Sequence, residues 1–174
     1  NLGGNTRLSR LRPMGMEGVF CWEGGDALKK LLVSACLLGV CCRYDGKSKL
    51  QPGMEALAEK FELIPVCPEQ LGGMSTPRIP SERVGDRVMN RDGADVTHHF
   101  VKGAEEALRI GRLLHCDGAL LKERSPSCGG GTIYDGSFSG GLKPGYGDFA
   151  EMLKTHGIQV YGEGDIPSLL DINR

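Results

Sequence analysis

The sequence predicts an α/β protein, a single-domain, Rossmann-like open sandwich with a mainly parallel sheet. Its 174 residues have the size of one domain. From Lys30 onward, short apolar runs alternate with segments of helical periodicity. Strands that alternate with helices favour right-handed crossovers and a parallel sheet covered on both faces.

Four short apolar runs are typical of buried strands. They span residues 31–35, 61–66, 118–121 and 158–161. The first strand is not followed by a G-x-G-x-x-G motif, so the architecture alone does not imply dinucleotide binding. Between the last two strands, residues 134–147 are expected to form a glycine-rich excursion.

Three segments have the spacing of helices. Residues 52–60 predict a short helix, and a longer one starts near Asp95 or Thr97, either of which is a suitable N-cap. Its apolar face is formed by Val96, Phe100, Ala104, Ala107, Leu108, Gly111 and Leu114. Asp148 and Glu151 have the spacing of a capping box, which predicts a third helix that ends at Gly157.

Charge and composition exclude several classes of protein. Lys and Arg number 21 against 22 Asp and Glu, a net charge of −1, which argues against binding to nucleic acid through bulk positive charge. There is no apolar run of about 18 residues and no adequate export signal. We therefore expect a cytoplasmic protein with reduced cysteines. We expect residues 1–29 to form a mobile or loosely docked extension, partly introduced or processed sequence, and residues 30–174 to form the domain.

Three cysteines each follow a predicted strand. Cys36 follows the first, Cys67 follows the second, and Cys128 comes after a short polar loop behind the third. Because the carboxyl ends of parallel strands meet at one edge of a sheet, the three thiols should converge there. Convergent thiolates without a neighbouring histidine favour thiophilic metal chemistry.

The spacing leaves several interpretations of these cysteines open. An iron–sulfur cluster accepts cysteines from distant loops. Structural zinc usually requires four ligands in paired C-x2-4-C spacing, which is absent here. The spacing is also compatible with a reactive-thiol enzyme and with cysteines that pack in the core without a ligand. Cys42 is the first reserve ligand, Cys116 belongs to the opposite edge, and Cys21 has no assigned role.

Five sequence blocks resemble the DUF523 family, which includes the thiouracil desulfidases. They are S-A-C-L-L-G-V-C-C-R-Y-D-G-K (34–47), C-P-E-Q-L-G-G-M-S-T-P-R-I-P-S-E (67–82), D-V-T (95–97), L-K-E-R-S-P-S-C-G (121–129) and P-G-Y-G (144–147). The resemblance covers about residues 30–162. It implies a cytosolic bacterial enzyme that carries a [4Fe-4S] cluster on Cys36, Cys67 and Cys128. It further implies that the iron without a cysteine ligand binds the sulfur of 2- or 4-thiouracil, and that water replaces this sulfur without redox chemistry, giving uracil and sulfide.

This reaction requires acid/base and binding groups near the cysteines. Glu69 is the best-placed carboxylate for general acid/base catalysis. Ser125 is the preferred hydroxyl to form hydrogen bonds with the water or with the edge of a pyrimidine. We expect Ser127, Arg78 and Asp45 to contribute to substrate binding. The expected partner is therefore a small thiolated pyrimidine.

Two further functions are compatible with the sequence. One is desulfuration of, or sulfur transfer to, thiolated tRNA bases, although the sequence has neither a G-x-x-x-x-G-K-[ST] motif nor an excess of positive charge. The second is a protein that binds an iron–sulfur cluster or a metal without catalysis. Loss of turnover on removal of Glu69 would distinguish the enzyme from a binding protein.

Overall fold

The computed structural model describes residues 28–172. The predicted extension of residues 1–29, apart from its last two residues, and Cys21 lie outside the described residues. Among the described residues, no helix has the length and apolar character needed to span a bilayer.

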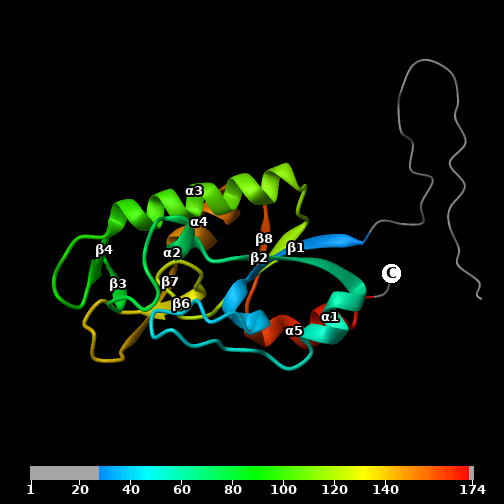
Figure 1. Cartoon of the computed structure of the whole chain (residues 1–174), viewed down its shortest axis with the longest axis horizontal. Coiled ribbons are helices and arrows are strands. Elements are labelled where there is room, and N and C mark those ends of the chain that lie inside the picture. The colour runs from blue at the N-terminus through cyan, green and yellow to red at the C-terminus, as the bar shows by residue number, and fades with distance from the viewer. Residues whose placement is uncertain (1–27, 173–174) are drawn as a thin grey trace, which may run out of the picture.

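A four-stranded parallel sheet forms the centre of the domain and confirms the predicted α/β class (Figure 1). Its strand order is β2-β1-β5-β8. The four strands are β1 (Lys29–Ser34), β2 (Phe61–Val66), β5 (Gly118–Leu120) and β8 (Gln159–Tyr161). They correspond to the four apolar runs, since buried parallel strands require apolar residues on both faces.

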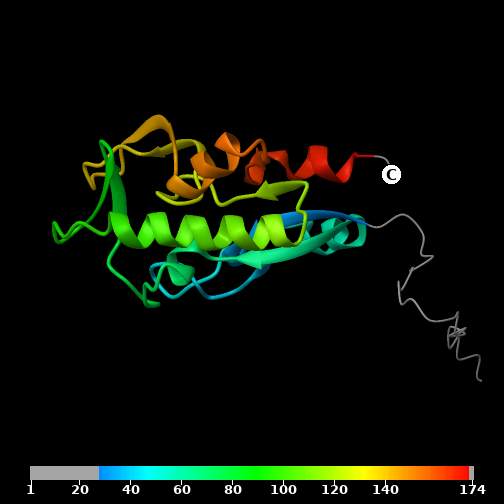
Figure 2. The same cartoon turned by 90° about the horizontal axis from the view of Figure 1, so that it is seen from above.

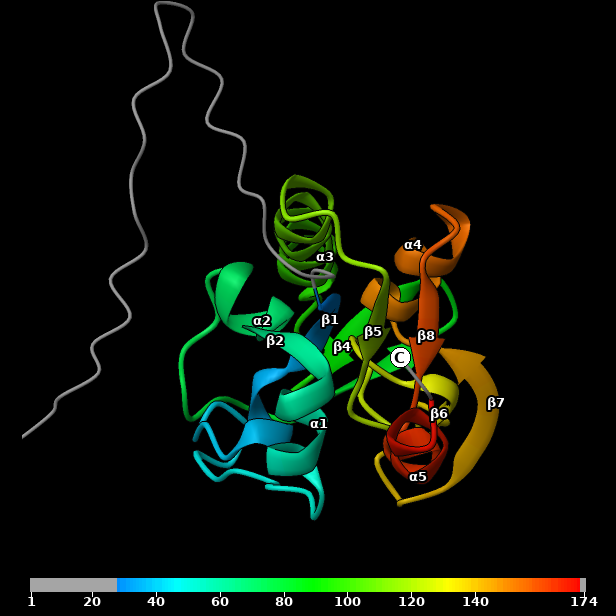
Figure 3. The same ribbon diagram turned by 90° about the vertical axis from the view of Figure 1, so that its right-hand side faces the viewer.

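Helices cover both faces of this sheet, as the alternation of segments predicts (Figure 3). The helices are α1 (Met54–Lys60), α2 (Pro68–Leu71), α3 (Thr97–Leu113), α4 (Asp148–Thr155) and α5 (Ile166–Leu170), with single 3₁₀ turns η1 (Ala35–Leu38) and η2 (Glu163–Asp165). One core joins alternate β1 residues, such as Leu31 and Val33, to α1 and α5. The other joins Leu32 to α3 and α4. Alternate residues of one strand therefore supply two separate cores.

Helix α3 runs along the length of the domain (Figure 2). Its buried residues are Phe100, Gly103, Ala104, Ala107, Leu108 and Gly111, in agreement with most of the predicted apolar face. At Gly103 a Cβ atom would lie 1.9 Å from the carbonyl oxygen of Pro68 in α2. Glycine therefore permits α2 and α3 to pack backbone against backbone, which fixes the position of α2 above the sheet edge.

Two β-hairpins outside the parallel sheet were not predicted. The first consists of β3 (Ser81–Val84) and β4 (Arg87–Asn90), and the second of β6 (Gly130–Tyr134) and β7 (Leu142–Tyr146). Strand β7 lies within the predicted glycine-rich excursion of residues 134–147, for which no strand was predicted. These strands are half exposed and rich in charged residues or glycine, so their apolar signal is weak.

The predicted helix caps also differ from the structure. Helix α4 begins at Asp148 but has no side-chain cap, so the capping box was wrong. The Asp148 carboxylate instead faces the Arg83 guanidinium, with 3.3 Å between Oδ1 and Nε. Asp148 therefore forms an ion pair with a residue of the first hairpin instead of capping its own helix. At α3 the Asp95 carboxylate accepts the Thr97 amide N–H at 2.9 Å, although Val96 occupies the N-cap position.

Candidate active site

A cavity of about 630 Å³ lies at the carboxyl edge of the parallel sheet. Its walls include Cys36, Cys67 and Cys128, which the sequence places after three different strands. The cavity lies where the chain leaves β1 and β5 towards opposite sides of the sheet. In open α/β sheets such a topological switch point is the usual place for a ligand, because the loops diverge there and leave a crevice.

Cys36 and Cys67 are brought together by the register of neighbouring strands. Ser34, the last residue of β1, pairs with Val66, the last residue of β2. After Ser34 the chain turns into η1, which buries Cys36 and ends at Gly39. After Val66 the next residue is Cys67, directly before α2. The parallel pairing therefore sets both thiols at the same edge.

Cys128 reaches this edge through a folded loop behind β5. The Ser125 Oγ accepts the backbone N–H groups of Ser127 and Cys128, each at 3.1 Å. The loop is joined to β1 by the Lys122 N–H, which donates to the Ser34 Oγ at 2.9 Å. Burial raises the pKa of the Cys128 thiol to about 12, against an opposing hydrogen bond with Ser34.

Cys42 is a fourth thiol on the cavity wall. Hydrogen bonding with Cys36 raises the pKa of Cys42 to about 11, with Cys67 acting in the opposite direction. The Cys67 Sγ lies 3.8 Å from the Cys42 carbonyl oxygen. Hydrogen bonding with Cys42, together with burial, raises the pKa of Cys67. Cys42, Cys36 and Cys67 therefore form a contiguous group of thiols.

The other described cysteines lie outside the cavity wall. Cys41 is exposed. Cys116 is half-buried and precedes β5, at the opposite edge of the sheet, as predicted.

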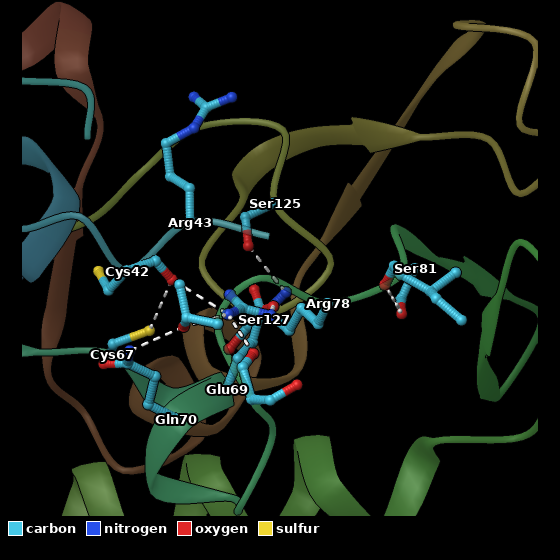
Figure 4. A network of polar contacts seen from close by, with 12 residues as sticks. Cys42, Arg43, Cys67, Glu69, Gln70, Arg78, Ser81, Ser125 and Ser127 are labelled. Carbon is cyan, nitrogen blue, oxygen red and sulfur yellow. Dashed lines mark hydrogen bonds and ion pairs between the residues drawn. The ribbon is translucent and has the colours of Figure 1, made fainter. Parts of the chain in front are cut away.

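Glu69 and Arg78 form an ion pair in the cavity wall (Figure 4). The Arg78 Nε donates to the Glu69 Oε2 at 2.5 Å, and the two side chains are 5% and 16% exposed. The Arg78 Nη1 donates to the carbonyl oxygens of Cys42 at 3.1 Å and Ser75 at 3.2 Å. Since these contacts fix the guanidinium, the carboxylate is held in one orientation beside the thiols.

The remaining predicted site residues are placed differently. Ser125 lines the cavity. Ser127 is fully buried, is not part of the cavity wall, and its Oγ has no hydrogen-bond partner among the described residues. Asp45 is also outside the wall; its pKa is lowered by its hydrogen bond with Arg43, and its Oδ1 accepts the Lys47 N–H.

Several residues of the cavity wall were not predicted from the sequence. Lys122 and Glu163 form an ion pair at 2.9 Å between the loop after β5 and η2. Glu82, Tyr134 and Phe138 come from the two hairpins. Lys122 could have been found from its place directly behind a strand end. The hairpin residues carry no comparable local signal.

Across residues 28–172, no group of three or more His, Cys, Asp or Glu side chains is arranged to hold one metal ion. The cysteines instead surround a cavity.

Comparison with known proteins connects this site to a family. Residues 31–165 match the family described as 2-thiouracil desulfurase. The uncharacterized protein YbbK of Bacillus subtilis (strain 168) is 37% identical over 150 residues, which cover 80% of this chain and 99% of YbbK. The solved structure of the [4Fe-4S]-dependent thiouracil desulfidase TudS (DUF523Vcz) is 46% identical, with a TM-score of 0.77, and the match covers 81% of this chain and 95% of TudS. The chain therefore belongs to the 2-thiouracil desulfurase family.

Proposed function

We propose that this protein is a [4Fe-4S]-dependent desulfidase that converts 2- or 4-thiouracil to uracil and sulfide without redox chemistry. One observation carries the proposal: thiols from three separate loops line one cavity beside an oriented carboxylate. Membership of the 2-thiouracil desulfurase family and the likeness to TudS support the same reaction.

The residues of the cavity fit an iron–sulfur cluster. Cys36, Cys67 and Cys128 would hold it, because thiolates are the usual ligands of such clusters and the three come from three separate loops. All three cysteines line one cavity of about 630 Å³, which is the site that the cluster would occupy. With three cysteine ligands, one iron would be left without a protein ligand and would supply a Lewis acid for the thiocarbonyl sulfur.

Glu69 is the proposed proton carrier. Exchange of sulfur for oxygen adds one water to the ring carbon, breaks the carbon–sulfur bond and releases sulfide as H₂S or HS⁻. Glu69 can accept a proton from the attacking water and return it to the leaving sulfur, so the carboxylate is regenerated in each turnover. Its place in the wall that also holds the cysteines supports this role.

Arg78 is proposed to orient Glu69 rather than to bind substrate directly. Its Nε holds one carboxylate oxygen, Oε2, and its Nη1 is occupied by backbone carbonyls and the Thr76 hydroxyl. Because the guanidinium engages Oε2, Oε1 is the oxygen proposed to exchange a proton.

Ser125 is the proposed hydroxyl of the substrate site. Its Oγ accepts two backbone N–H groups, so its own hydrogen remains available to donate to a pyrimidine oxygen or to the water. Ser127 and Asp45 lie outside the cavity wall, and substrate binding is therefore assigned to Ser125.

Anaerobic purification followed by iron and sulfide analysis tests the cofactor. Wild-type protein should be coloured, and Cys36→Ala, Cys67→Ala and Cys128→Ala should each lose both iron and turnover. Cys116→Ala is the matched control, because this thiol lies at the opposite edge of the sheet, and it should keep both. Iron-free wild-type protein under strict anaerobiosis would contradict the cofactor.

Loss of the near-ultraviolet band of 4-thiouracil, measured together with released sulfide, tests the reaction. 2-Thiouracil serves as the second substrate in the same assay. Iron-loaded protein that consumes neither compound would contradict the reaction while leaving the cofactor intact.

A further inference from the structure

The second hairpin contributes an aromatic side chain to the cavity wall. This side chain has no role in the proposed exchange of sulfur. The loop of residues 135–141 joins β6 to β7, and its Phe138 lines the cavity. We call this segment the Phe138 loop. Tyr134 and Tyr44 also line the cavity, but they are 36% and 44% exposed, whereas Phe138 is half-buried.

A buried carboxylate of the first hairpin holds the Phe138 loop in place. Glu82 is 8% exposed, and its Oε2 accepts the backbone N–H groups of Gly136 at 2.9 Å and Phe138 at 3.0 Å. Among the described residues, no Lys, Arg or His forms a salt bridge with Glu82. A buried charge is tolerated when hydrogen bonds replace its hydration, and here the loop supplies both donors. The carboxylate therefore acts as a clamp on the loop.

The loop is held in a conformation that an aromatic residue rarely adopts. Phe138 has a φ of 57°, in the left-handed region that disfavours bulky side chains. At Gly136 a Cβ atom would lie 2.8 Å from the Arg83 carbonyl oxygen, so glycine is needed for the loop to reach β3. A lysine also links the two hairpins. The Lys143 Nζ donates to the carbonyl oxygen of Arg83 at 3.0 Å and to that of Asp135 at 3.1 Å. Such strain persists where the surroundings over-determine it, which is typical of functional sites.

We propose that Phe138, positioned by Glu82, forms the aromatic wall against which the ring of the thiopyrimidine lies, and so determines the affinity for the ring. The proposal rests on the proposed function. A pyrimidine is flat, and every such ring has a π-face that can stack on an aromatic side chain with little dependence on its substituents. Since the thiols and Glu69 lie on other segments of the chain and a phenyl ring cannot transfer a proton, Phe138 is assigned to binding and not to the exchange of sulfur.

Steady-state kinetics of iron-loaded Phe138→Ala test the wall. We expect KM for 4-thiouracil to rise about tenfold or more, while kcat stays within about twofold and iron content is unchanged. Phe138→Tyr should restore most of the affinity, and Phe138→Leu should restore only part of it. An unchanged KM, or an equal loss in kcat and kcat/KM, would overturn the proposal.

Equilibrium binding separates this proposal from the proposed function. Calorimetric titration of iron-loaded protein with 4-thiouracil, or with uracil if turnover interferes, should give an affinity about tenfold or more weaker in Phe138→Ala than in wild type. Wild-type protein that binds the ring without turnover would contradict the reaction, but the comparison with the variant still decides the wall. Wild-type protein that turns over while both proteins bind the ring equally would overturn the wall alone. Wild-type protein that binds neither compound would overturn both.

The clamp is tested through Glu82. Glu82→Ala should accelerate hydrogen exchange of the amides of Gly136 and Phe138 by about tenfold or more and raise KM as Phe138→Ala does. The double variant should be no worse than Phe138→Ala alone, because Glu82 acts through Phe138. Glu82→Gln keeps one acceptor oxygen and gives an intermediate variant if the alanine variant is unstable.

Asp86→Asn is the matched control, because Asp86 is an exposed carboxylate in the turn of the same hairpin. It should change neither hydrogen exchange in the Phe138 loop nor KM. Unchanged exchange in both Glu82 variants, or additive effects in the double variant, would show that Glu82 does not position Phe138.

Discussion

The Arg78 guanidinium and the Glu69 carboxylate meet at 2.5 Å, and the same guanidinium reaches the backbone carbonyl of Cys42 at 3.1 Å. One side chain thus joins the acid/base candidate to the loop that follows the first cysteine. The orientation of Glu69 is therefore coupled to the conformation of the thiol-bearing loops.

Replacement of Arg78 should reduce the rate more than it reduces binding. Arg78→Lys keeps the charge but loses the fork of donors that holds both Glu69 and the carbonyls. We expect kcat to fall by about tenfold or more with iron content retained. Arg109→Lys, a substitution at an exposed α3 position, is the control and should leave kcat unchanged. A loss of iron in Arg78→Lys would instead indicate a structural role in the cysteine loops.

Removal of the Glu69 carboxylate should separate the cluster from its chemistry. Glu69→Gln keeps the shape of the side chain but cannot carry a proton, so turnover should fall by about 10²–10⁴-fold, the usual contribution of a general acid/base. The visible absorbance and iron content should match wild type. Glu62→Gln, at an exposed position on β2, is the control. A normal rate in Glu69→Gln would remove the acid/base assignment.

Two glycines of α3 should respond differently to a methyl group. In Gly103→Ala the added Cβ meets the Pro68 carbonyl oxygen at 1.9 Å, whereas in Gly111→Ala it meets the tip of the Leu32 side chain at 2.6 Å. A side-chain tip can move and a packed backbone cannot. Overpacking costs about 1–3 kcal/mol, so we expect Gly103→Ala to lose at least that much unfolding free energy and Gly111→Ala to lose less.

Urea unfolding of both variants measures this difference. Gly103→Ala should also lower kcat, because α2 carries Glu69 and must move to relieve the clash. Equal destabilisation of the two variants would mean that α2 shifts freely.

The ionisation of Asp148 should make the free energy of unfolding depend on pH. Burial raises the pKa of this carboxyl above its usual value near 4, against the opposing charge of Arg83. The folded protein therefore keeps a proton on Asp148 at pH values where the unfolded chain has released it. The stability that this protonation contributes is fully present at acidic pH and is lost as the pH rises through the raised value.

Asp148→Asn does not titrate, so it isolates this contribution. The unfolding free energy of wild type minus that of Asp148→Asn should become more positive as the pH falls from neutrality towards about 4. Urea titrations at several pH values measure it, with Asp92→Asn as an exposed control. A difference that does not vary with pH would contradict the raised pKa.

The parallel sheet and its cysteines could be predicted because both follow from local pattern and topology. The run of residues 61–66 coincides with β2, and parallel strands leave no choice about which edge their carboxyl ends share. The strand pattern alone therefore predicted that Cys36, Cys67 and Cys128 lie at the same edge of the sheet.

The rest of the site depends on contacts between distant parts of the chain. Glu82 and Phe138 are 56 residues apart, and no local pattern pairs them. The hydroxyl of Ser127 could not be placed, because sequence does not give the direction of a side chain in an irregular loop. At the start of α4, the Asp148 carboxylate pairs with Arg83 of the first hairpin instead of forming the local cap, as tertiary contacts commonly override local signals.

The two hairpins form sheets of their own and share no strand with the parallel sheet. The cavity wall is therefore built from separate structural units: segments at the carboxyl edge of the parallel sheet carry the thiols, and the hairpins carry Glu82, Tyr134 and Phe138. A lineage could remodel the hairpin part of the wall for larger or differently substituted rings while the part at the sheet edge, and with it the chemistry, stays as it is. For an engineer who wants a new substrate, residues 135–141 are accordingly the place to begin.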